Sequence, residues 1–115
     1  MSINGIITDA LKPIAPTFPD EYSGSAETYI VFNFNDTGAL FADNAPVFQR
    51  YSVQVHLFCP AQFNSVSMRG NIRQALFAAG LSWADIINAG MEYNVNGVAS
   101  KQHYVFECEY IEGVD

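Results

Sequence analysis

The chain has 115 residues, half of them hydrophobic and 14% aromatic, so it can bury one core and does not have the composition of a disordered chain. Twelve acidic residues against five scattered basic ones give a formal charge of −7, which disfavours nucleic-acid binding, because phosphate binding needs clustered lysines and arginines. No stretch approaches the ~20 apolar residues of a membrane span, and the N-terminus lacks the basic and apolar segments of a signal peptide. We therefore expect one domain, residues 1–115, made and kept in a cytosol.

The N-terminal segment predicts an amphipathic helix followed by a loop. Apolar residues fall on one helical face from Ile3 to Ile14. Pro13 ends or kinks the helix, and residues 16–26 are rich in turn-forming residues, so we expect them to form a connecting loop.

Two strands are expected next. Residues 29–34 (YIVFNF) are apolar on both alternating faces, which is typical of a strand inside a sheet. Residues 47–58 alternate between an apolar and a polar face and predict the strongest strand of the sequence. Such a strand spans roughly 40 Å, whereas a compact domain of this length is about 35 Å across, so part of this hairpin is expected to project. The intervening residues 35–46 have the composition of a loop, although they contain Leu40 and Phe41.

The second half predicts a helix and a hairpin. A helix capped by Ser65 or the residue before it is expected to run to about Ala79. Residues 81–90 fit either a short turn or irregular chain. The last two strands are expected at residues 91–94 and 100–111, around an Asn-Gly turn.

The predicted order of elements is α-β-β-α-β-β. Two hairpins and two helices without a regular alternation of strands and helices favour an α+β fold. We expect a single domain with an antiparallel or mixed four-stranded sheet and both helices packed on one face.

The histidines and cysteines are the first candidates for chemistry. His56 with Cys59, and His103 with Cys108, would make a good tetrahedral zinc set. However, positions three or five apart on a strand point to opposite faces, so neither pair chelates from one side without a break, which Pro60 could supply. We predict no metal site and no cofactor, and interpret both cysteines as reduced, partly buried hydrophobes.

No catalytic residue is predicted. A nucleophilic cysteine needs a nearby base and an electropositive pocket, whereas Glu107 and Glu109 flank Cys108. These carboxylates fit a solvated acidic strand face better than a general acid–base pair. The sequence contains no phosphate-binding loop and no dinucleotide-binding or hydrolase motif, so the chain is not expected to be an enzyme.

Aromatic residues are numerous for one small sheet. If they lie on both faces, a second layer or a neighbouring subunit must cover some of them, because large exposed apolar patches are rare on monomers. This favours a protein that assembles with other chains.

The order of these features resembles the tail-terminator, or tail-completion, proteins of long-tailed bacteriophages, which are also described as head–tail joining or minor capsid proteins. The likeness covers nearly the whole chain and lies in its layout. It consists of a short N-terminal helix, a proline-rich segment (PIAPTFP), a strand (TYIVFNF), a loop, a long strand (QRYSVQVHLFCP), a helix (MRGNIRQALFAAG) and a final strand (KQHYVFECEYIEG).

The resemblance implies a structural protein of the virion, made in the bacterial host cytoplasm and placed at the head-proximal end of the tail. It implies a homo-oligomeric ring, usually a hexamer, that caps the tail tube, stops its polymerisation and docks to the head–tail connector. The partners would be the tail tube protein and the connector proteins. DNA would pass through the ring without specific binding, and no membrane would be involved.

Leu40 and Phe41 are the candidate contact residues, because an apolar loop tip gains nothing in water. We expect them to pack on a neighbouring subunit or on the tube. Three alternatives stay open. One is a head-completion or connector ring, which also acts by stacking. Another is a small homodimeric ligand-binding domain with a pocket between sheet and helices. The third is an enzyme, which would be favoured if His56 or His103 lay beside a carboxylate at the base of a cleft.

Overall fold

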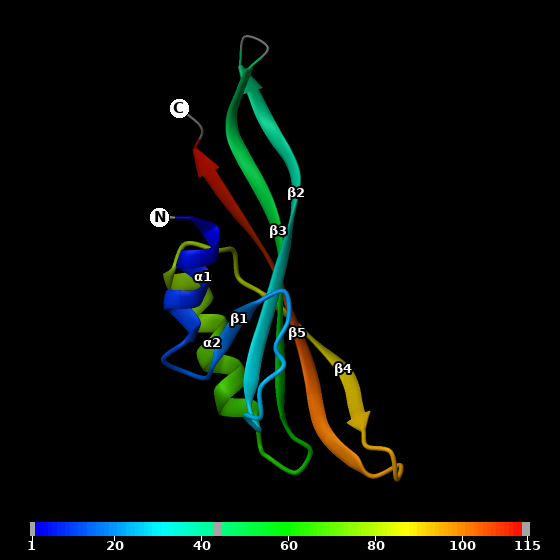
Figure 1. The fold of residues 1–115 in the computed structure, drawn as a ribbon. Helices are drawn as coiled ribbons and strands as arrows, with labels where there is room; N and C mark the ends of the chain where they lie inside the picture. Colours follow the sequence, from blue (N-terminus) through cyan, green and yellow to red (C-terminus); the bar gives the residue numbers. More distant parts are fainter. Residues whose placement is uncertain (1, 43–44, 114–115) are drawn as a thin grey trace.

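A computed structural model describes the backbone of residues 2–42 and 45–113, and the side chains of residues 2–37 and 48–112. The five strands form one mixed sheet in the order β1-β2-β3-β5-β4 (Figure 1). Strands β1 and β2 are parallel, and the other neighbours are antiparallel. The elements are, in chain order, α1 (Ile3–Leu11), β1 (Thr17–Pro19), β2 (Tyr29–Ala42), β3 (Ala45–Pro60), α2 (Val66–Ala78), β4 (Asp85–Tyr93) and β5 (Ala99–Gly113).

The prediction of a four-stranded sheet in the order α-β-β-α-β-β is wrong. Residues Thr17–Pro19, expected in a loop, form a fifth strand, and the order is α-β-β-β-α-β-β. The Ile30 N–H donates to the Pro16 carbonyl at 2.8 Å, and the Asp20 N–H donates to the Phe32 carbonyl at 2.8 Å. A three-residue strand is too short to show a period, and its proline is tolerated because β1 lies at the sheet edge.

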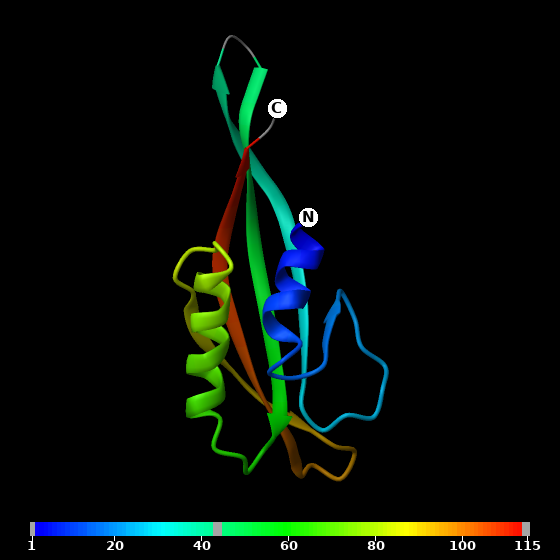
Figure 2. The same ribbon diagram turned by 90° about the vertical axis from the view of Figure 1, so that its left-hand side faces the viewer.

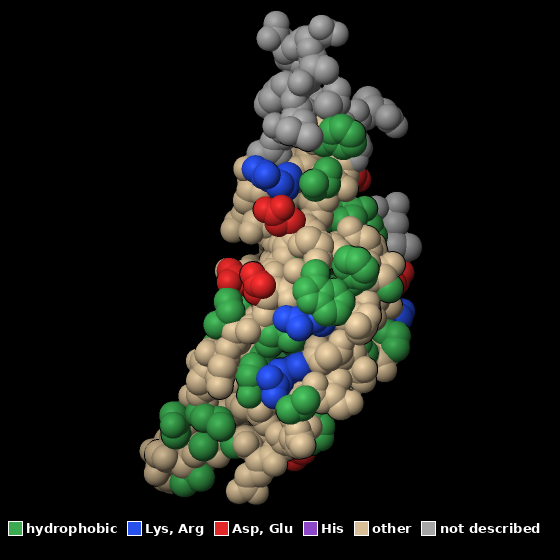
Figure 3. Space-filling model, turned by 180° about the vertical axis from the view of Figure 1, so that it is seen from behind, with side chains coloured by type: hydrophobic (Ala, Val, Ile, Leu, Met, Phe, Trp, Pro, Cys, Tyr) green, Lys and Arg blue, Asp and Glu red, His purple; other side chains and the backbone are tan. Residues whose placement is uncertain are grey.

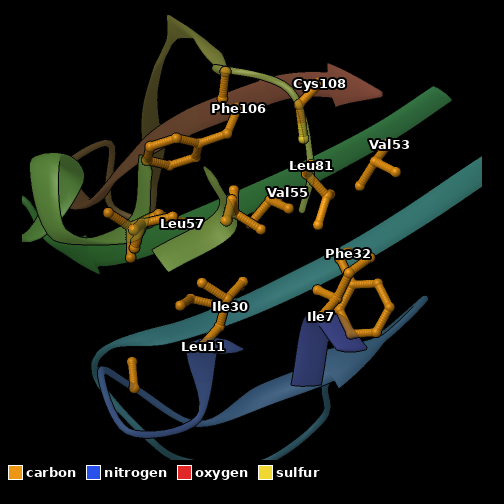
Figure 4. Close-up of a cluster of buried hydrophobic side chains, with 14 of the residues drawn as sticks. Ile7, Leu11, Ile30, Phe32, Val53, Val55, Leu57, Leu81, Phe106 and Cys108 are labelled. Carbon is orange, nitrogen blue, oxygen red and sulfur yellow. The ribbon is translucent and has the colours of Figure 1, made fainter. Parts of the chain in front are cut away.

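Both helices pack on the same face of the sheet (Figure 2). Figure 4 shows Ile7 and Leu11 of α1 facing Phe32 and Ile30 of β2. Each fully buried aliphatic or aromatic side chain stabilises the fold by about 1.5–3 kcal/mol. The largest fully buried side chains belong to α1, α2 and the three central strands: Phe32, Phe106, Ile7, Leu11, Ile30, Leu57, Ile72, Leu76, Val53, Val55 and Cys59.

The expected projection of the long hairpin is confirmed. The molecule measures 58 × 25 × 23 Å, and the β2–β3 hairpin extends beyond the helices (Figure 1). The predicted loop at residues 35–46 is wrong wherever the structure describes it, because β2 continues to Ala42 and β3 begins at Ala45. Residues 43–44 of that loop lie outside the described residues. Irregularities in the register between Asp36 and Gly38, and between Leu40 and Phe41, accommodate the turn-forming residues within the ladder.

The last hairpin is longer than expected. Strand β4 begins at Asp85 in the segment that gave no clear pattern, because a register shift between Asn88 and Met91 interrupts its alternation. Gly90, inside this irregularity, has a φ of 93°, a conformation that favours glycine. The predicted Asn-Gly turn is confirmed, since Gly97 has a φ of 77°. No helix in the described part of the chain is long and apolar enough to cross a membrane.

Candidate site on the open face of the sheet

No helix in the described part of the chain covers the second face of the sheet, here called the open face (Figures 1 and 2). Because successive strand residues point to opposite sides, the neighbours of the core residues point to this face. On β3 these are Gln54, His56 and Phe58, which alternate with the fully buried Val55 and Leu57. The polar face predicted for β3 is therefore the face that stays open.

A row of aromatic rings crosses the open face from β1 to β5. The ring centroids lie 4.5 Å apart for Phe18 and Tyr22, and 4.6 Å apart for Tyr22 and Tyr29. The next distances are 5.0 Å from Tyr29 to Phe58 and 4.2 Å from Phe58 to His103. Aromatic pairs at such distances contribute about 0.5–1.5 kcal/mol each beyond the area that they bury. The row therefore fixes the segment after β1 against the centre of the sheet.

The row ends in a pair of histidines. His56 Nδ1 and His103 Nε2 lie 2.9 Å apart, so one imidazole donates a hydrogen bond to the other. The register explains the contact: His56 is opposite Val105 and His103 is opposite Phe58, so the two histidines are diagonal neighbours on antiparallel strands.

Burial favours the neutral form of both imidazoles. Desolvation lowers the pKa of His56, and the neighbouring His103 lowers it further. Desolvation also lowers the pKa of His103, although the carboxylate of Glu92 partly opposes this change. Neutral imidazoles have a free lone pair, which is the form that accepts a proton or binds a metal.

The histidine pair lies in a groove, here called the histidine groove, with a volume of about 370 Å³. Asp20 and Glu21 contribute two acidic residues to its lining. Asp20 has a φ of 64°, which aspartate tolerates better than most residues, and its N–H is held by the Phe32 carbonyl. The lining residues are Asp20, Glu21, Tyr22, Tyr29, Val31, Asn33, His56, Phe58 and His103.

The structure separates the four residues of the zinc set that the sequence offered. Cys59 and Cys108 are buried in the core with free thiols, whereas His56 and His103 lie on the open face. Burial raises the pKa of Cys108 to about 11, and it raises the pKa of Cys59 against the opposing charges of Arg69 and Lys101. Within residues 2–42 and 45–113, no group of three or more histidine, cysteine or acidic residues is arranged to hold a metal ion.

The candidate contact residues lie near the tip of the long hairpin. The backbones of Leu40 and Phe41 belong to β2 and pair with Phe48 and Pro46 of β3. Their side chains lie outside the described part of the structure, so the predicted contact stays a prediction.

The paired carboxylates of β5 point into a second hollow on the open face. Glu107 and Glu109 line it together with Asp85, Ser52 and Ser82, and its volume is about 340 Å³. Ser82 fixes the strand there, because its hydroxyl accepts from the Glu109 N–H at 2.8 Å. This arrangement is an acidic, solvated surface.

Sequence reasoning missed the residues that surround the histidine pair. The sequence predicted no site role for Phe58 or Tyr29, and it placed Tyr22, Asp20 and Glu21 in a connecting loop. The alternation along β3 places Phe58 on the same face as His56, which was a usable signal. The stacking of Tyr22 depends on the parallel strand β1, and no sequence pattern predicted that strand.

Hydrophobic side chains are also exposed away from the groove. At the tip of the β4–β5 hairpin, Tyr93, Val95 and Val98 expose 64%, 101% and 60% of their surface, and Figure 3 shows hydrophobic groups where this hairpin lies, at the lower left. Near the end of α2, the exposed rings of Phe77 and Trp83 lie 5.5 Å apart in an edge-to-face contact.

Comparison of the sequence with models of known protein families finds no match, and comparison with curated proteins finds none either. The resemblance to tail terminators therefore rests on the layout of helices and strands alone.

Proposed function

We propose that the chain is a structural assembly protein of a phage tail, which forms a ring, terminates the tail tube and joins it to the head connector. The observation that carries the proposal is the open face of a long sheet whose other face is filled by helices. A sheet that buries one face and leaves aromatic and apolar side chains on the other is suited to contact with further chains.

The apolar side chains of the open face and of the sheet edge support this role. Ile87 and Ile111 expose 43% and 55% of their surface, and they lie on strands rather than in flexible loops. Strand β4 has only β5 as its neighbour, so its outer edge presents unpaired backbone groups. A ring needs different surfaces on the two sides of each subunit, and a sheet with a long edge and an open face provides them.

The charge of the protein supports the passage of DNA without binding. The open face carries Asp85, Glu107 and Glu109 around one hollow, and Asp20 and Glu21 beside the histidine groove. Carboxylates repel the phosphates of DNA, and six copies of a chain with a net charge of −7 would carry ~42 negative charges. The acidic groups of the open face therefore favour the passage of DNA without binding.

The first test is the mass of the purified protein by light scattering across a dilution series, with negative-stain images of the same fractions. Rings of about six subunits, or rings that form when tail tubes are added, are the expected result. A monomer or dimer at every concentration that never caps a tube contradicts the proposal.

A double substitution tests the contact surface. Changing Leu40→Asp and Phe41→Asp together should abolish ring formation and leave the fold intact, because charged groups at an apolar contact lose their hydration. Ser67→Asp with Asn71→Asp, both at exposed positions of α2, adds the same charge elsewhere and should leave assembly unchanged. If rings form normally with the first pair, the hairpin tip is not the contact.

A small ligand-binding domain is the second candidate, and the histidine groove favours it. The groove lies on the open face and not between sheet and helices, where the sequence-based alternative expected a pocket. A stable dimer whose melting temperature rises with a small ligand would support this reading over the ring.

A further inference from the structure

The chain contains two histidines, and the fold brings both into one contact on the open face. We propose that His56 and His103 form a binding site for a divalent transition-metal ion of the kind that imidazole prefers, with Zn²⁺, Ni²⁺ and Cu²⁺ as its members. The inference concerns the single chain, so it holds whether or not the protein forms rings.

The distance between the two nitrogens fits this assignment. Two imidazole nitrogens bound to one metal, each about 2.05 Å from it, lie about 2.9 Å apart at a right angle and about 3.3 Å apart at the tetrahedral angle. His56 Nδ1 and His103 Nε2 are 2.9 Å apart. A metal on the groove side of the pair therefore needs rotation of the rings but little movement of the strands.

The backbone supports this arrangement because both ligands lie on central strands. Strands β3 and β5 pair continuously from Phe48 to Pro60, so the two Cα positions are fixed by the ladder. Phe58 stacks on His103 at 4.2 Å, which restricts that ring to one side. Ligands held on rigid strands lose little conformational entropy when the metal binds.

The protonation state is also suitable. Burial lowers the pKa of both imidazoles, which favours their neutral, metal-binding forms. One of the two facing nitrogens carries the proton of their hydrogen bond. For both nitrogens to bind a metal, that proton must move to the second nitrogen of its own imidazole ring. No net proton is released when neutral imidazoles bind the metal, and protonation at lower pH competes with the metal.

The surroundings attract a cation. Asp20 and Glu21 line the same groove. The negative charge of Glu92 favours a positive charge at His103 and so raises its pKa. The positive charge of Lys101 opposes cation binding. Its ammonium lies 5.5 Å from the Tyr29 ring centroid and donates a hydrogen bond to the Glu27 carbonyl at 2.8 Å. Two protein nitrogens leave the remaining coordination positions to water, so the bound metal should exchange readily.

The experiment is calorimetric titration of the tag-free, full chain with ZnCl₂ and NiCl₂ at pH 7.5, with native mass spectrometry to count ions. We expect one ion per chain. His56→Gln and His103→Gln should each weaken binding by roughly tenfold or more, because each removes one of the two protein ligands. Glu109→Gln is the matched control and should bind as the unchanged protein does, because Glu109 lies on the same face but six residues along β5 from His103, opposite Ser52 of β3.

A measurement on the unchanged protein removes any dependence on how the variants fold. In NMR spectra of the ¹⁵N-labelled chain, Zn²⁺ should shift the imidazole signals of both histidines together, and lowering the pH to 5 should reverse the shift. The proposal is overturned if neither metal binds, if both glutamine variants bind as tightly as the unchanged chain, or if the imidazole signals do not move.

Discussion

Removing the ring of Tyr22 should cost a large share of the stability that the aromatic row contributes. The ring lies 4.5 Å from Phe18 and 4.6 Å from Tyr29, and its hydroxyl accepts from the Ala26 N–H at 2.9 Å. Each ring pair is worth about 1 kcal/mol, and the hydrogen bond about 1 kcal/mol. Tyr22→Ala should therefore lower the free energy of unfolding by about 3 kcal/mol, and Tyr22→Phe by about 1 kcal/mol.

Gly24 supplies a second way to move the same ring. A Cβ at Gly24 would overlap the hydroxyl end of Tyr22, so Gly24→Ala must displace the ring and lower the free energy of unfolding. In the Tyr22→Ala background the overlapping atoms are absent, and Gly24→Ala should then be almost neutral. The two substitutions should be strongly non-additive, as expected of residues in direct contact.

Urea denaturation followed by the fluorescence of Trp83, the one tryptophan of the chain, measures these changes. Trp83 packs on Phe77 near the end of α2 and does not contact the row, so its signal reports global unfolding. If Tyr22→Ala is no more destabilising than Tyr22→Phe, or if the Gly24 and Tyr22 effects add, the row does not hold the segment after β1.

Three further predictions concern the histidines, a cysteine and the core. The folded pKa values of His56 and His103 lie below their usual value of 6.5, so the unfolded chain binds more protons just below that pH. The free energy of unfolding should be highest above about pH 6.5 and fall as the pH drops below it; urea titrations from pH 5 to 8 should show this slope, and the double glutamine variant should flatten it. The Cys108 thiol, buried and with a pKa of about 11, should react with a thiol reagent only when the chain unfolds, so a fast reaction in native buffer would contradict its burial. Phe106→Ala should lower the free energy of unfolding by about 3–5 kcal/mol because the ring is fully buried, and Phe106→Leu should cost clearly less in the same denaturation assay.

The elements that the sequence predicted well are those in which one period runs unbroken. The alternation from Val47 to Phe58 predicted β3, and the helical spacing around Ile72 predicted α2. The elements that it missed are interrupted or very short. Register irregularities hide the C-terminal part of β2 and interrupt the pattern of β4, and β1 has only three residues. In each case pairing with the neighbouring strand fixes the extended conformation, and the local sequence does not predict that pairing.

The candidate site was predictable in one respect. Strand alternation correctly separates His56 from Cys59 and His103 from Cys108, so the sequence argued against the four-residue zinc set. The meeting of the two histidines depends on the register between β3 and β5. A shift of two residues would keep both on the open face but place them either directly opposite each other or four residues out of register, and packing against the helices sets the register.

The proposed ring and the proposed metal site share the open face, and thermodynamic linkage therefore joins them. If a neighbouring subunit covered the histidine groove, the pair would lose its remaining contact with water, and assembly would exclude a metal that needs water ligands. A metal that binds only the free subunit must then weaken assembly, whereas a metal bound equally in both states leaves assembly unchanged. The effect of Zn²⁺ on the masses of the assemblies in solution consequently shows whether a neighbouring subunit covers the histidine groove or another part of the open face. In the second case the histidine groove stays uncovered, and the neighbour contacts another part of the open face, such as the acidic hollow around Glu107 farther along the sheet.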